Sequence, residues 1–131
     1  MKRLILILTI LCISIINLKS QSLQDLQEYA DRSYNDQQFK ESFKLYERIL
    51  YFNDSITSDD FFRIGECKRQ LNEYDAALYY YNLAINQSGV DSIKANYYIK
   101  ICHILISNLR YSKAIQSLLI AQQISNEQQL V

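Results

Sequence analysis

The chain of 131 residues contains no proline and no tryptophan, and its only glycines are Gly65 and Gly89. Tight turns between strands draw heavily on glycine and proline, so this chain has little material for a sheet built from hairpins. Proline is also the residue that a helix interior tolerates least, and its absence leaves long helical segments uninterrupted. The composition therefore favours an all-α protein.

The chain also lacks an excess of either charge, because 14 basic residues balance 14 acidic ones. No dense basic patch could follow a phosphate backbone, which makes nucleic acid a poor candidate partner. The single histidine, His103, stands beside Cys102, but adjacent residues of a helix do not face each other. No Cys/His motif offers a metal site, and no glycine-rich loop could cradle a phosphate. We therefore expect no enzymatic activity, no cofactor and no small-molecule substrate.

The N-terminus has the three-part layout of a secretory signal peptide. Residues 1–3 are basic at Lys2 and Arg3, residues 4–16 are almost wholly apolar, and residues 17–20 restore polarity. The apolar segment is shorter than the roughly 20 residues that cross a bilayer. We predict that residues 1–20 are a signal peptide removed near Ser20 and that the protein is exported to the periplasm or cell envelope. An uncleaved membrane anchor is the alternative.

Two cysteines remain in the domain of residues 21–131, namely Cys67 and Cys102. In an exported protein they could pair. Both lie on apolar faces of expected helices, where free cysteine packs as a small hydrophobic side chain. The sequence does not place their Cα atoms within reach of a disulfide, so the pairing stays open.

Three stretches of this domain can be superimposed on one another. Their aromatic anchors, Phe39, Tyr74 and Tyr111, are 35 and 37 residues apart. Three residues after each anchor comes a small side chain, and four residues later comes a bulky one. Such spacing places these positions on one face of a helix. The small residues are Ser42, Ala77 and Ala114, and the bulky ones are Tyr46, Tyr81 and Leu118.

The spacing of apolar residues predicts six helices, which short links pair as antiparallel hairpins. Ser58 is the N-cap that we expect for the third helix, and the fourth is expected to end near Ser88 and Gly89 in a left-handed stop. Residues 53–55 break the second helix. The helices are expected at about 22–35, 38–52, 58–71, 74–86, 91–107 and 111–125.

The repeat resembles that of the tetratricopeptide family, whose period is about 34 residues. In the middle repeat, Ile64 and Gly65 stand at the leucine-glycine pair of the family, and Ala77 and Tyr81 fall on its second-helix packing positions. The resemblance implies a right-handed α-solenoid of three antiparallel helix hairpins. The repeats would cover about 23–54, 58–89 and 95–126.

This chain departs from the family pattern in two respects. The usual proline after each second helix is missing, and no polar capping helix follows the third repeat. An uncapped last repeat exposes an apolar side. Self-association through the C-terminal hairpin and continuation of the chain into a longer protein are both left open.

The resemblance also implies a function in protein–protein interaction. Members of the family bind their ligands along the first helices of successive hairpins, on the concave face. The mixture of acids, amides and apolar groups at these positions suits a peptide or protein partner with a basic part and an apolar part. Carried over to this sequence, the positions are Gln27, Asp31, Tyr34, Asn35, Phe62, Glu66, Arg69, Gln70, Asn96, Ile99 and His103.

Two functions remain open at this point. The first is an exported interaction scaffold in the cell envelope. The second is the extracytoplasmic sensory or ligand-binding segment of a signalling receptor, a kinase or transcription regulator, that continues beyond this chain. A membrane span after Val131 would favour the receptor, whereas an in-frame stop there would favour the scaffold.

Overall fold

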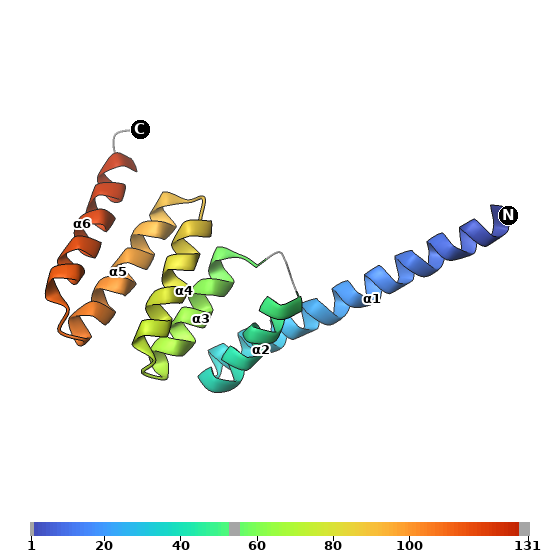
Figure 1. Ribbon diagram of the computed structural model, residues 1–131, viewed down its shortest axis with the longest axis horizontal. Helices are drawn as coiled ribbons and strands as arrows, with labels where there is room; N and C mark the ends of the chain where they lie inside the picture. The colour runs from blue at the N-terminus through green and yellow to red at the C-terminus, as the bar shows by residue number, and fades with distance from the viewer. Residues whose placement is uncertain (1, 53–55, 129–131) are drawn as a thin grey trace. The chain divides into compact units, whose positions relative to one another are not determined.

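The computed structural model describes residues 2–52 and 56–128, with side chains complete from residue 22 within these ranges. The described residues form only α-helices, joined by short links (Figure 1). The helices are α1 (Lys2–Asn35), α2 (Phe39–Phe52), α3 (Ser58–Gln70), α4 (Tyr74–Gln87), α5 (Asp91–Ser107) and α6 (Tyr111–Gln128).

Contacts within the chain divide it into two units, Met1–Asp54 and Ser55–Val131. In the first unit α1 packs on α2. In the second unit α3 packs on α4, α5 packs on α6, and α4 also contacts α5. The expected pairing into three hairpins is therefore confirmed. Residues 53–55, which we expected to break the second helix, lie outside the described residues.

In the first unit, α1 begins at Lys2 rather than near residue 22 and continues through the segment predicted to be a signal peptide. No glycine or proline precedes Gly65, so nothing in the sequence interrupts this helix. Near the C-terminal end of α1, the carbonyl of Ala30 accepts a hydrogen bond at 3.0 Å from the hydroxyl of Ser42, a fully buried residue of α2. The hydroxyl thus finds a partner where the family pattern has alanine. None of the helices that the described residues form has the length and apolarity needed to cross a bilayer.

The core of the second unit is built around the positions that the repeat marks as small or bulky. Ala77, Tyr81 and Ala84 of α4 are fully buried. A Cβ atom added to Gly65 of α3 would lie 2.8 Å from ring carbons of Tyr81, which is closer than such atoms approach one another. Gly65 and Ala77 are therefore sites where α3 and α4 approach closely. Cys67 and Cys102 are buried free thiols.

The three links within the hairpins share one backbone conformation. Gln37, Asn72 and Leu109 have φ angles of 60°, 61° and 58°, the left-handed conformation that ends many helices. Their separations equal those of the aromatic anchors, so the turn repeats with the helices. Gly89, by contrast, has no positive φ, and the expected left-handed stop there is wrong. α4 does end at Ser88, within the expected pair, but this residue is extended and the end needs no glycine.

The N-cap of α3 is Thr57 and not Ser58 as expected. The Thr57 hydroxyl accepts the amide hydrogen of Asp60 at 3.2 Å, while the Thr57 amide donates to the Asp60 carboxylate at 2.9 Å. This reciprocal pair is a capping box. Ser58 has another role, because its hydroxyl donates to the carbonyl of Ala84 at 3.0 Å. It also lies 3.2 Å from the Tyr97 hydroxyl, and so links α3 to α4 and α5.

Candidate functional site

In the second unit, the predicted partner-binding positions lie on two helices that touch. The ring of Phe62 on α3 stacks on Tyr97 of α5, with centroids 4.8 Å apart and planes 17° from parallel. Phe62 is half-buried by this contact rather than freely exposed. The stack brings one side of α3 next to one side of α5.

Glu66 is the centre of a buried polar network behind this contact. Only 5% of Glu66 is exposed. Its carboxylate accepts a hydrogen bond from the Tyr81 hydroxyl and two from the Arg69 guanidinium, at 2.8 and 3.3 Å. Burial acts to raise the pKa of Glu66, but the hydrogen bonds from Arg69 and Tyr81 outweigh it and hold that pKa below its ordinary value. Burial and the neighbouring carboxylate raise the pKa of Tyr81.

The network changes what Glu66 can offer to a partner. Its charge is neutralised inside the protein, so it cannot serve as the open acidic contact that the sequence indicated. The Arg69 side chain remains about one-third exposed, at 32%, and reaches the surface. The expected basic part of a ligand therefore has no partner at this carboxylate.

Lys100 of α5 is a residue of this surface that the sequence analysis missed. It is exposed, and its positive charge also lowers the pKa of Glu66. Asn96, Lys100 and His103 follow the i, i+4, i+7 spacing of one helix face, and all three are exposed. This spacing is the signal that could have found Lys100. We define the α3–α5 face as Phe62, Glu66, Arg69, Asn96, Lys100 and His103.

Two predicted positions lie at the margins of the α3–α5 face. Gln70 is exposed in the last turn of α3, and Ile99 is exposed on α5, one residue before Lys100. Helical neighbours point about 100° apart, so Ile99 turns away from the direction of Lys100.

The predicted positions of the first unit lie together on α1. Asp31 accepts a hydrogen bond from the Tyr46 hydroxyl of α2. Tyr34 packs edge-on against Phe39 with centroids 5.9 Å apart. Gln27 is half-buried and Asn35 is exposed. The structure thus brings together the predicted residues of α3 and α5 in one unit, and those of α1 in the other.

The same chemistry recurs in both units. Tyr46 and Tyr81 stand at the same repeat position, and each donates its hydroxyl to a carboxylate on the first helix of its hairpin. A charge-assisted bond of this kind satisfies a tyrosine that would otherwise bury a polar group. In the third repeat the tyrosine is replaced by Leu118.

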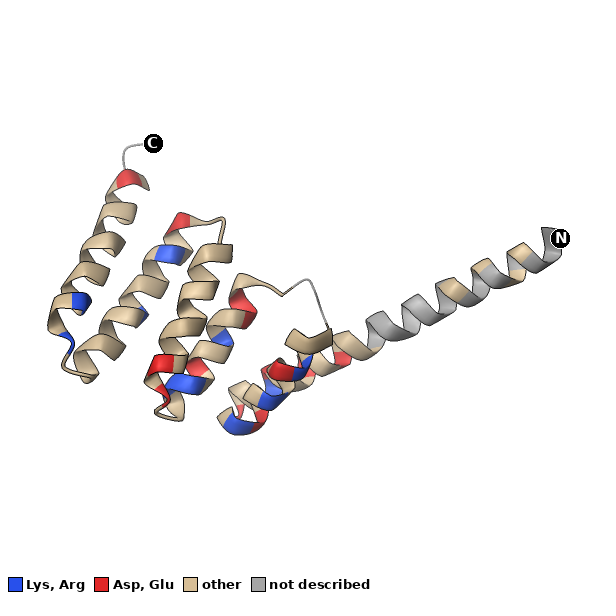
Figure 2. Cartoon of the chain, viewed as in Figure 1, with Lys and Arg blue, Asp and Glu red and all other residues tan. Residues whose placement is uncertain are grey.

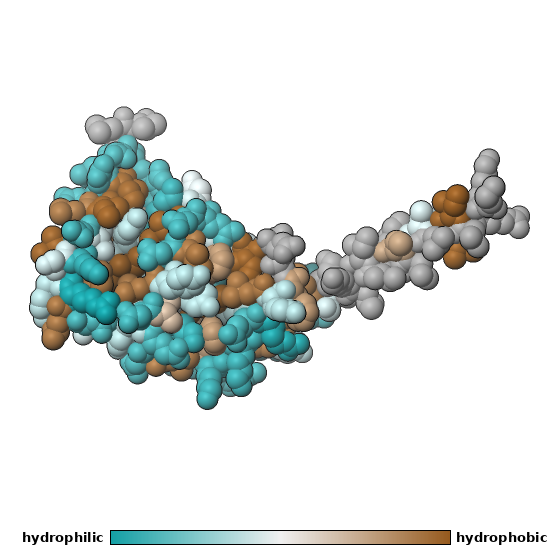
Figure 3. Space-filling view, in the orientation of Figure 1, coloured by the Kyte–Doolittle hydropathy of each residue, from teal (hydrophilic) through white to brown (hydrophobic). Residues whose placement is uncertain are grey.

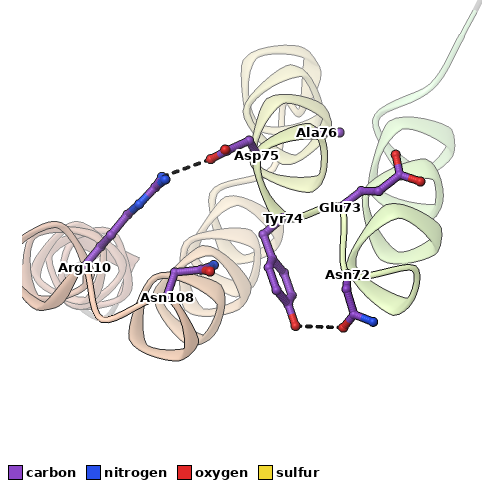
Figure 4. Close-up of a pocket in the computed structure, with 7 residues that line it drawn as sticks. All are labelled: Asn72, Glu73, Tyr74, Asp75, Ala76, Asn108 and Arg110. Carbon is purple, nitrogen blue, oxygen red and sulfur yellow. Dashed lines mark hydrogen bonds and ion pairs between the residues drawn. The ribbon is translucent and has the colours of Figure 1, made fainter.

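A depression in the second unit lies at the hairpin turns, apart from the α3–α5 face. It has a volume of about 340 Å³ and is lined chiefly by polar side chains (Figure 4). Arg110 donates to Asp75 at 3.0 Å, and the Tyr74 hydroxyl donates to Asn72 at 2.9 Å. The Arg110–Asp75 pair links the two turns at an exposed surface, whereas the Tyr74–Asn72 bond lies within one of them. Among the residues with described positions, no three histidine, cysteine or acidic side chains are grouped to hold a metal ion.

The arrangement of paired helices defines a tetratricopeptide-like, all-α fold. No protein-family model and no curated protein matches the chain. Among solved structures, it resembles the type III secretion translocator chaperone SycD of Yersinia enterocolitica, with a TM-score of 0.67 and 18% identity over 80% of this chain and 75% of SycD.

Two further structures show related chaperones with bound peptides. SycD in complex with a peptide of the translocator YopD has a TM-score of 0.69 and 18% identity, covering 79% of this chain and 76% of SycD. PcrH in complex with the chaperone binding region of PopB has a TM-score of 0.68 and 14% identity, covering 82% of this chain and 83% of PcrH. At these identities the likeness shows the fold, and the predicted fold of helical hairpins is confirmed.

Proposed function

We propose that this protein binds a segment of a peptide or protein partner on the α3–α5 face. One observation carries the proposal. Glu66 is neutralised by Arg69 inside the protein, whereas Lys100 and His103 are exposed on α5, the helix on which the half-buried ring of Phe62 stacks. Such a surface combines an apolar anchor point with charged groups that fix orientation. SycD and PcrH, which have this fold, are both seen with bound peptides, and this supports the proposal.

The charges of the α3–α5 face specify the chemistry of the partner. Arg69 is partly exposed and its charge is balanced by the buried carboxylate of Glu66, so the net positive charge of the face comes from the exposed Lys100. We therefore propose a partner segment that carries an apolar side chain and at least one carboxylate. This replaces the basic segment expected from the sequence, where Glu66 counted as an open acid.

A charge-reversal pair tests the proposal. Peptides that bind the full chain would first be selected from a random library and their affinities measured by fluorescence anisotropy. Lys100→Glu replaces an exposed cation on the α3–α5 face, and we expect it to weaken binding about tenfold or more. Lys113→Glu makes the same change at an exposed position of α6 and serves as the control. Equal affinities of the two variants would place the binding site elsewhere.

We further propose that the protein acts as a scaffold in the cell envelope after export, with residues 1–20 removed. The basic residues Lys2 and Arg3 and the apolar segment 4–16 support this proposal. Expression in a Gram-negative host, followed by fractionation and N-terminal sequencing, tests it. A mature chain that begins near Gln21 in the periplasmic fraction is the expected result. A full-length chain confined to the cytoplasmic fraction would contradict export.

A further inference from the structure

The last helix of the second unit presents apolar side chains that are more than half exposed among the residues with described positions. Tyr111, Ile115, Leu118 and Leu119 of α6 are each more than half exposed, at 54%, 59%, 52% and 58%. Figure 3 shows apolar residues among hydrophilic ones on the last two helices in the face in view. Scattered exposed apolar residues are ordinary, but a contiguous group marks an interaction surface.

Three of these side chains, Tyr111, Ile115 and Leu118, border a groove between α5 and α6, which we call the α5–α6 groove. It has a volume of about 180 Å³ and no charged residue in its lining. Figure 2 shows the charges of α6 only toward its two ends, where Lys113 and Glu127 stand. The groove is lined by Cys102, Ile106, Tyr111, Ala114, Ile115 and Leu118.

The repeat places this groove where α5 packs one hairpin earlier. With the shift of 37 residues between repeats, Ala114 corresponds to Ala77 and Cys102 to Gly65. In the middle hairpin, Ala77 shares a buried cluster with Tyr97 and Ile101 of α5. The α5–α6 groove is therefore the repeat equivalent of the surface on which α5 packs against the middle hairpin. One more helix could pack there in the same way.

The lining of the α5–α6 groove differs from that of the middle hairpin in one respect. There Tyr81, Glu66 and Arg69 form the polar network described above. The corresponding residues of the last hairpin are Leu118, His103 and Ile106. A helix bound in the groove would therefore contact the apolar side chains of Leu118 and Ile106 instead of a hydrogen-bonded tyrosine. A charged or strongly polar side chain would lose its hydration there without gaining a partner.

We propose that the α5–α6 groove binds an amphipathic helix of a protein partner. The contacting face of that helix is apolar and carries an aromatic and a branched side chain four residues apart. Tyr97 and Ile101 of α5 provide the pattern, because this pair fills the corresponding place in the middle hairpin. The site is separate from the α3–α5 face, so the inference goes beyond the proposed function.

A peptide with the sequence of α5, Asp91–Ser107, is the probe, with Cys102→Ser to prevent oxidation. A fluorophore on the peptide reports its binding to the full chain. Leu118→Arg places a charge in the groove at a position that is already half exposed, and we expect it to weaken binding about tenfold or more. Gln116→Arg, at an exposed position on the far side of α6, should leave the affinity unchanged.

Three results would overturn the proposal. The first is a wild-type chain that does not bind the α5 peptide, and the second is equal binding by the Leu118→Arg and Gln116→Arg variants. The third comes from sedimentation of the chain alone. A dimer that Leu118→Arg converts to a monomer would show that a second copy of this chain fills the groove. Circular dichroism of both variants checks that the helices persist. As a second control, an α5 peptide with lysine in place of Tyr97 and Ile101 should not bind.

Discussion

At the scale of single residues, hydrogen bonds between tyrosine and carboxylate tie the two helices of a hairpin together. Tyr46 bonds to Asp31, and Tyr81 bonds to Glu66, at equivalent positions of successive repeats. Loss of one partner from such a pair leaves a buried polar group unsatisfied, which costs more than the bond contributes on balance. Glu66 is the more sensitive of the two acids because it is buried and ion-paired as well.

Protonation of Glu66 should therefore lower stability in acid. Its pKa in the folded protein lies below the ordinary value of 4.5. The carboxylate thus contributes stability above about pH 4.5, and this contribution is lost as the pH falls through the lowered folded-state pKa. We expect urea unfolding of Glu66→Gln to give a flatter pH profile than wild type below pH 4.5. Glu127→Gln, at an exposed position, is the control, and identical slopes for all three proteins would contradict this role.

The two glycines provide a second test at this scale. A methyl group on Gly65 would clash with the Tyr81 ring, whereas one on Gly89 would meet nothing within 4 Å. In Gly65→Ala, about 1 kcal/mol of gained helix propensity opposes an overpacking cost of about 1–3 kcal/mol. We expect the free energy of unfolding to fall by about 1 kcal/mol on balance. Gly89→Ala should leave it unchanged or raise it by up to about 1 kcal/mol. A stabilised Gly65→Ala would show that the hairpin is packed less closely than described.

At the scale of elements, the apolar spacing in the sequence predicted the helices well. The helix Asp91–Ser107, for example, has its expected bounds. The errors fall at helix ends. Ser58 and Gly89 have the right residue types for caps, but Thr57 forms the capping box and Ser88 ends α4. Which of two adjacent polar residues caps a helix depends on the path of the backbone, and a residue type alone does not determine that path.

The candidate site was predicted less completely than the fold. The helical repeat placed Phe62, Arg69 and His103 on the correct helices. The burial of Glu66 could not be predicted, because it depends on Tyr81, which stands 15 residues away on the next helix. Lys100 was missed because the positions were taken from the family pattern and not from the exposed face of α5.

The capping box of α3 can be tested directly. Thr57→Ala removes the hydroxyl that accepts the Asp60 amide hydrogen. We expect the free energy of unfolding to fall by about 1 kcal/mol, since an uncapped N-terminus leaves a donor unsatisfied. Thr57→Ser keeps the acceptor oxygen and should retain most of the stability. Equal losses of stability in Thr57→Ala and Thr57→Ser would contradict the capping role of the Thr57 hydroxyl.

At the scale of the whole molecule, the second unit has a core of its own. The buried cluster that joins α4 and α5 and reaches Ala114 of α6 is made entirely of residues from Ser55–Val131. We predict that this fragment folds without the first unit and unfolds in one cooperative transition. Far-ultraviolet circular dichroism during heating measures it. A fragment without helical signal at 25 °C would show that the core needs the first unit.

Amide chemical-shift mapping of a library-selected peptide on the isotope-labelled full chain tests whether the proposed partner segment binds the α3–α5 face. We expect the largest shifts on α3 and α5, around Arg69 and Lys100. Shifts confined to α6 around Leu118, or to the hairpin turns around Arg110, would contradict the claim.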